Sequence, residues 1–138
     1  MLIVPPEPVL APTGWPAVIA WKDTREAQRA AAASLPMLRH ASTVHVFERC
    51  EPGGRDAAIA RLNDVVGWLG RHGIAADAHV GPPGPTGIDE DILLFAEAQG
   101  AGLIVAGGYG HARLREWALG GVTHELLATA PVCVLLSH

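Results

Sequence analysis

Apolar residues along this chain gather in short continuous runs, separated by longer stretches in which they recur with helical spacing. The runs lie at 16–21, 43–47, 103–106 and 131–136. Continuous runs of this length are typical of strands buried on both faces of a sheet. A further segment, Ile74 to Val80, alternates more between apolar and polar residues, so we expect it to form a strand toward a sheet edge.

Segments with helical character lie between these runs. We expect helices from Asp23 or Thr24 to about His40, over 56–72 and 88–98, and in a last segment that ends near Thr129. Pro36 should kink or shorten the first helix, since proline has no N–H to donate. In the second helix the apolar face is predicted to comprise Ile59, Leu62, Val66 and Leu69, with Gly73 as the C-cap. The proline- and glycine-rich segment 81–87 is predicted to be a loop.

Strands that alternate with helices predict an α/β fold. We expect a single doubly wound domain with a five-stranded, mostly parallel sheet and about four helices. The length of 138 residues and the hydrophobic content of 49% suit one such domain with its own core. We assign it to residues 15–138 and treat 1–14 as an extended N-terminal segment. In such sheets, ligands bind outside the carboxyl ends of the strands.

Charge and composition narrow the function classes. The net charge is −4 and the basic residues are scattered, so we expect no nucleic-acid partner. No apolar run approaches the roughly 20 residues that span a bilayer, so we expect no membrane association. The two cysteines lack metal-ligand spacing, and we predict no metal site and a reducing, cytoplasmic location.

The stretch with the strongest character of a binding site follows the apolar run 103–106. It places glycines at Gly107, Gly110 and Gly120, and glycine lets backbone N–H groups converge on an anion. A P-loop is ruled out, because Gly108 and Tyr109 stand where Lys and Ser or Thr are needed. A dinucleotide fingerprint fails because its third glycine is replaced by arginine.

This glycine spacing resembles that of the universal stress protein family. The resemblance extends to residues 17–27, which look like the family's first strand and turn, to His45 and Val46 in the second strand, and to 130–136 in the last strand. It implies a five-stranded parallel α/β domain that is usually dimeric. Some members of the family bind ATP and others do not.

The resemblance also implies a set of site residues. Gly107, Gly110 and Gly120 match the family's three glycines, and Val46 matches an apolar residue beside the adenine. Gly121 stands where ATP binders usually have Ser or Thr, Lys22 where they usually have Asp, and Gly102 where Asp is frequent. Backbone N–H groups at Gly121 and Val122, at the expected start of the last helix, still favour an anion. The predicted nucleotide site is therefore Lys22, Val46, Gly107, Gly110, Gly120, Gly121 and Val122, with ATP or AMP as ligand.

Three functions remain open at this point. The leading one is a cytoplasmic stress-response protein that binds an adenine nucleotide without catalytic turnover as its main task. An alternative is a dimerisation or interaction module that no longer binds ATP, which the residues at 22 and 121 favour. A second alternative is a weak ATPase or phosphotransferase, although phosphoryl transfer needs metal-binding and nucleophile-positioning groups that the glycine loop does not supply. We predict no catalytic residue.

The first residues resemble the end of a stress-protein last strand, as in the second half of a tandem pair. Such a strand can pair with a sheet edge of its own chain or of a partner. We expect a homodimer through the last strand, at Val132, Val134 and Leu136, with Leu2 and Val4 as further candidates.

Overall fold

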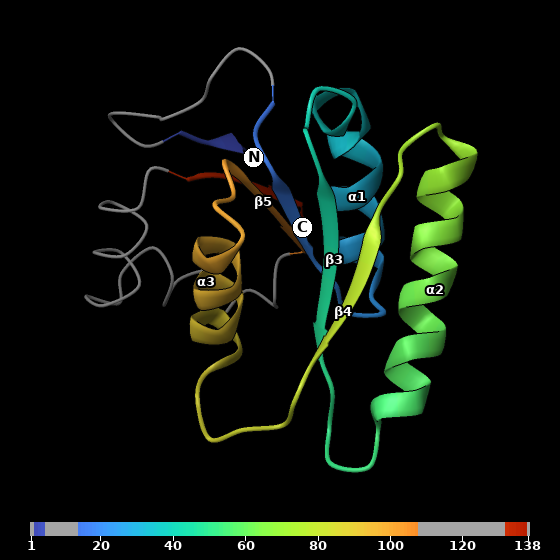
Figure 1. The fold of residues 1–138 in the computed structure, drawn as a ribbon, viewed down its shortest axis with the longest axis vertical. Coiled ribbons are helices and arrows are strands. Elements are labelled where there is room, and N and C mark those ends of the chain that lie inside the picture. Colours follow the sequence, from blue (N-terminus) through green and yellow to red (C-terminus); the bar gives the residue numbers. More distant parts are fainter. Residues whose placement is uncertain (1, 5–13, 108–131, 138) are drawn as a thin grey trace.

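A twisted sheet with helices on both faces forms the framework of the molecule (Figure 1). The structure, a computed structural model, describes residues 2–4, 14–107 and 132–137. Among these, the strands are β1 (Leu2–Ile3), β2 (Ala17–Ala20), β3 (Val44–Arg49), β4 (Asp77–Gly81), β5 (Leu103–Gly107) and β6 (Cys133–Ser137). The helices are α1 (Arg25–Leu38), α2 (Arg55–Arg71) and α3 (Ile88–Ala98).

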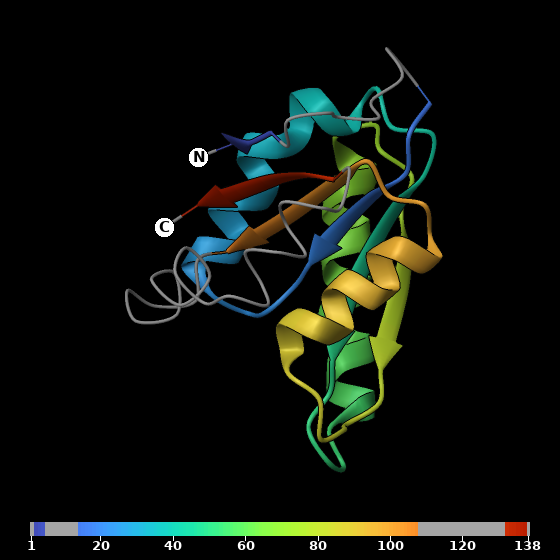
Figure 2. The same ribbon diagram turned by 90° about the vertical axis from the view of Figure 1, so that its left-hand side faces the viewer.

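The strand order is β1-β6-β5-β2-β3-β4. Strands β2 to β6 pair in parallel, as predicted, and β4 lies at one edge. Helices α1 and α2 cover one face and α3 covers the other (Figure 2). The helix predicted to end near Thr129 falls outside the described residues.

Burial on both faces explains the continuous apolar runs. Successive residues of β2 alternate between two cores: Ile19 packs beneath α1 and α2, whereas Val18 and Ala20 pack beneath α3. Every residue of β2 and β5 is buried. A strand with helices on both faces has no solvent side for polar residues, so alternation disappears.

Helix α1 begins and ends close to the predicted positions. The Thr24 hydroxyl accepts a hydrogen bond from the Ala27 N–H at 3.3 Å, which caps the helix. Pro36 lies inside the last turn, and the helix ends at Leu38. Proline is tolerated there because only a short piece of helix follows the missing hydrogen bond.

The predicted apolar face of α2 is wrong by part of a turn. The buried residues are Ala58, Leu62, Val65 and Leu69, whereas Ile59 is 38% exposed. The predicted and the observed residues both have helical spacing. In the observed face, the small side chain of Ala58 is fully buried. Gly73 follows the helix with φ of +77°, a conformation that glycine adopts readily at a helix end.

The N-terminal strand pairs with the last strand of its own chain. Leu2 and Ile3 lie antiparallel to Leu135 and Val134, and β1 thus covers the outer edge of β6. Val134 and Leu136 are only 1% and 5% exposed, so their side chains belong to the core of this chain. The homodimer through β6 stays a prediction, and β1 of the same chain occupies the main-chain edge of β6 at Val134 and Leu135. Within the described part of the chain, we find no helix with the length and apolar character to cross a membrane.

Candidate functional site

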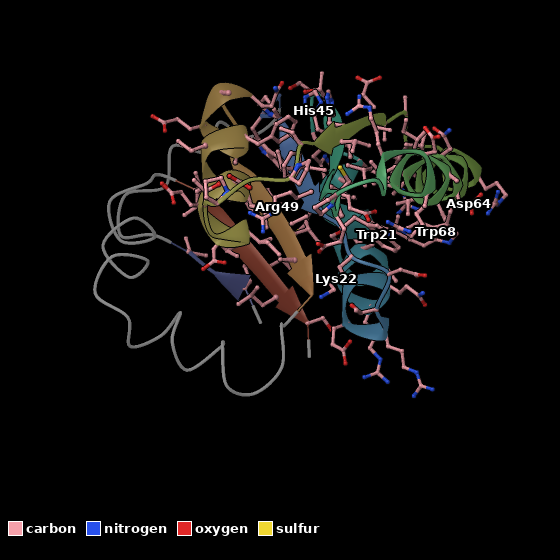
Figure 3. The ribbon with its side chains drawn as sticks, turned by 90° about the horizontal axis from the view of Figure 1, so that it is seen from below. Trp21, Lys22, His45, Arg49, Asp64 and Trp68 are labelled. Atoms are coloured by element: carbon pink, nitrogen blue, oxygen red, sulfur yellow. The ribbon has the colours of Figure 1, made fainter. Side chains whose placement is uncertain are left out.

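The carboxyl ends of β2 and β5 meet where the order of the sheet reverses. Residues that follow β2 go on to β3 and β4 on one side, whereas β5 and β6 lie on the other. Ala20 and Ala106 are paired at the ends of the two strands. Such a topological switch point opens a crevice in doubly wound sheets, because the connections leave in opposite directions. Figure 3 looks onto this edge.

Gly107 closes β5 directly against the first turn of α1. A Cβ atom at this position would lie 2.4 Å from the Ala27 nitrogen and 2.7 Å from the Glu26 carbonyl carbon. Both distances are shorter than real Cβ contacts allow. The absence of a side chain at Gly107 is therefore a packing requirement of the fold, whatever else the residue does.

Lys22 lies at the same edge as Gly107. It follows the end of β2 and its side chain is exposed. Val46, by contrast, is 0% exposed and lies in the core beneath α1 and α2. The predicted contact of Val46 with an adenine thus finds no accessible surface in this conformation. Gly110, Gly120, Gly121 and Val122 lie outside the described residues, so the structure places only part of the predicted site.

A polar cluster holds the start of α3 against the carboxyl end of β3. The Arg49 guanidinium donates to Asp91 at 2.9 Å and also to the backbone carbonyl of Thr86. The Thr86 hydroxyl donates to the second Asp91 oxygen at 2.6 Å. The hydrogen bond from Thr86, followed by the Arg49 guanidinium, holds the pKa of Asp91 below its usual value. These contacts fix the loop before α3 to the carboxyl end of β3.

Two histidines that sequence reasoning did not connect form a pair beneath α3. The His45 Nδ1 and His79 Nε2 atoms are 3.0 Å apart, and both rings contact Phe95. One ring must donate and the other accept, so the contact requires that at least one be neutral. Burial, and then the nearby His45 ring, lower the pKa of His79. Adjacent strands place the two residues together, a signal that is visible only once the strand order is known.

No group of three or more His, Cys, Asp or Glu side chains in the described part of the chain is arranged to hold a metal ion. The described residues of the edge thus offer a cation at Lys22 and the backbone of Gly107, whose Cβ position is occupied by the first turn of α1. That combination suits an anionic ligand more than a metal.

Comparisons with known proteins show which known structures this architecture resembles. The sequence matches no protein-family model. No curated protein matches it either. Solved structures do match: a protein from the universal stress protein family of Burkholderia pseudomallei has a TM-score of 0.63 and 21% identity, covering 80% of this chain and 94% of that one.

Two further similar structures were solved with ligands. The universal stress protein from Archaeoglobus fulgidus in complex with dAMP has a TM-score of 0.67 and 22% identity, covering 88% of this chain and 97% of that one. A universal stress protein in complex with cAMP has a TM-score of 0.67 and 15% identity, covering 91% and 98%. Identities this low identify the architecture and leave the ligand to be established separately. The chain has the fold of the universal stress proteins.

Proposed function

We propose that the chain binds an adenine mononucleotide at the carboxyl ends of β2 and β5. The observation that carries this proposal is the reversal of strand order between these two strands, with Lys22 and Gly107 at the same edge. Structures with the same fold were solved with dAMP and with cAMP, both of which are adenine mononucleotides.

The residues at the edge favour a monophosphate over magnesium-bound ATP. Lys22 supplies a positive charge to a single phosphate, and backbone N–H groups of the glycine loop, as predicted from the sequence, supply further donors. Gly121 has no hydroxyl to offer a longer phosphate chain or a metal ion. The proposed role is therefore nucleotide sensing or storage in a cytoplasmic stress response, without turnover.

A second function competes with this one. Gly107 is explained by its close approach to α1 alone, and Val46 has no accessible surface. Both observations favour an interaction module that keeps the fold and has lost the nucleotide. The two proposals differ in one measurable property, the affinity for nucleotides.

Calorimetric titration with AMP, cAMP and ATP, with and without magnesium, separates them. We expect AMP or cAMP to bind more tightly than ATP, with no gain from magnesium. Lys22→Ala should weaken AMP binding by about tenfold, the equivalent of one charge-assisted contact. Arg71→Ala, which removes an exposed cation at the far end of α2, serves as the control and should leave affinity unchanged. The absence of heat at millimolar nucleotide would refute the nucleotide proposal and leave the interaction module.

A further inference from the structure

A cleft of about 470 Å³ lies between α1 and α2, beside the end of β2. Its walls include Trp21, Gln28, Ala31, Asp64, Val65 and Trp68. Figure 3 shows Trp21 and Trp68 between the two helices, with Asp64 beside α2. The α1 wall contains two alanines, Ala31 and Ala32, whose small side chains leave the space open. The volume falls within the range of about 300–1,000 Å³ that is typical of small-molecule sites.

One polar atom beside this cleft lacks a partner. The indole Nε1 of Trp21 is buried and has no hydrogen-bond partner among the described residues. A buried N–H group that makes no hydrogen bond is costly, so such groups regularly meet an acceptor from a ligand or from water. Trp21 lines the cleft, so a ligand seated there that displaces the group covering this N–H would bring an acceptor to it.

The charges of the cleft favour a cation. Arg61 is the basic residue of the lining, and it is bound to Glu48, which is 8% exposed; the Arg61 Nε lies 3.1 Å from the Glu48 Oε1. The hydrogen bond to Glu48 raises the pKa of Arg61, and the charge of Asp23 adds to this rise. With the Arg61 charge matched by Glu48, the lining carboxylates of Asp23 and Asp64 leave the cleft with a net negative charge. The lining side chains thus favour a cation over an anion.

The remaining wall offers an aromatic surface. Trp68 is half-buried, and its ring meets the His72 ring edge at a centroid distance of 4.8 Å, which holds it in place. An indole near carboxylates attracts organic cations, because the ring face and the carboxylates are both negative. Flat aromatic ligands also bury apolar area against such a wall.

We propose that this cleft binds a flat aromatic amine that carries a hydrogen-bond acceptor on its ring. The ammonium group meets the carboxylates of Asp23 and Asp64, the ring packs against Trp68, and the acceptor takes the free N–H of Trp21. The cleft lies between α1 and α2 and adjoins the proposed nucleotide site at residues 21–23. The two sites have opposite charge preference, and neither proposal rests on the other.

A set of three related compounds tests each part of this assignment by calorimetry. Serotonin has an indole ring, an ammonium group and a ring hydroxyl, and we expect it to bind. Tryptamine lacks the hydroxyl and should bind about fivefold more weakly, the equivalent of one hydrogen bond. Hydroxyindoleacetate replaces the ammonium with a carboxylate and should show no measurable binding.

Substitutions test which residues of the cleft contact the ligand. Trp21→Phe keeps an aromatic ring and removes the N–H, so serotonin and tryptamine should bind this variant equally. Trp15→Phe is the matched control, since Trp15 packs against the same core but does not line the cleft. Asp64→Asn should weaken serotonin about tenfold, whereas Asp56→Asn, an acidic residue in the first turn of the same helix, should have no effect.

Several results would overturn the proposal. Failure of the unmodified chain to bind serotonin at millimolar concentration would do so, as would binding of hydroxyindoleacetate with equal affinity. Equal effects of Asp64→Asn and Asp56→Asn would show that the carboxylate acts elsewhere. The comparison of the three compounds on the unmodified chain stands even if Trp21→Phe fails to fold, because it requires no variant.

Discussion

Replacing Gly107 with alanine should force the first turn of α1 away from β5. The added Cβ would lie 2.4 Å from the Ala27 nitrogen and 2.7 Å from the Glu26 carbonyl carbon. Both are backbone atoms, which cannot turn aside as the end of a flexible side chain can. Ala27 is itself buried, with 3% exposure, so α1 cannot tilt locally without opening the core beneath it.

The size of the effect follows from these contacts. Inserting a group into a close-packed core costs about 1–3 kcal/mol. A shift of the first turn also disturbs the hydrogen bond from the Ala27 N–H to the Thr24 hydroxyl, a cap of the kind that contributes about 1 kcal/mol. We therefore expect Gly107→Ala to lower the free energy of unfolding by about 2–4 kcal/mol.

Urea unfolding followed by circular dichroism, with no nucleotide present, measures this loss. Gly70→Ala is the matched control, because a Cβ there meets nothing within 4 Å. Inside a helix that change should stabilise the protein by about 0.5–1 kcal/mol. A Gly107→Ala protein as stable as the unmodified chain would refute the reasoning, since it would mean that β5 and α1 do not touch at this point.

Three further predictions follow from the described contacts. Burial and the His45 ring lower the pKa of His79, so the unfolded chain binds more protons than the folded one. The free energy of unfolding should therefore fall as pH decreases below about 6.5. His79→Gln should reduce this pH dependence in urea titrations at a series of pH values, and an unchanged pH dependence would contradict the assignment. Thr86→Val removes the hydrogen bond that contributes most to the lowered pKa of Asp91 and should destabilise the protein by about 1 kcal/mol at neutral pH. The stability that depends on the Asp91 carboxylate is present above its ordinary pKa and is lost as pH falls below about 4. The free energies of unfolding of the variant and the unmodified chain should therefore become equal in acid, and a difference that does not change with pH would contradict this prediction. Deleting residues 1–12 uncovers the edge of β6, and sedimentation should then show a larger fraction of dimer if this edge is the predicted interface; an unchanged mass distribution would contradict that interface.

Much of the fold was predictable because buried strands and helices have characteristic patterns of apolar residues in the sequence. Helix α3 spans Ile88–Ala98 as predicted, since its apolar spacing is bounded by the glycine-rich loop before it and by Gly100 after it. The face of α2 was not predictable in the same way. Residues 58 and 59 both fit a helical stripe with Leu62 and Leu69, and the seating of the helix on the sheet decides between them. That choice depends on tertiary contacts that periodicity does not contain.

The site was less predictable than the fold, because its groups come from separate elements. His45 and His79 meet because β3 and β4 are neighbours in the sheet. Trp21, directly after β2, and Trp68, in α2, line one cleft because α2 lies beside α1 on the same face of the sheet. The spacing of neither pair in the sequence indicates that its two residues lie close together, so a motif search along the chain would not find them.

Gly107 shows how a motif residue can be required by the fold before it is required by a ligand. Glycine spacing led to the expectation of a nucleotide site, yet the close approach of α1 accounts for this glycine without any nucleotide. Glycine spacing is thus stronger evidence for the architecture than for the ligand. Evidence for a ligand is stronger where a buried polar group has no partner, as holds for the Trp21 N–H among the described residues. On this reasoning the cleft between α1 and α2 deserves the first binding experiments, with the nucleotide titration beside them.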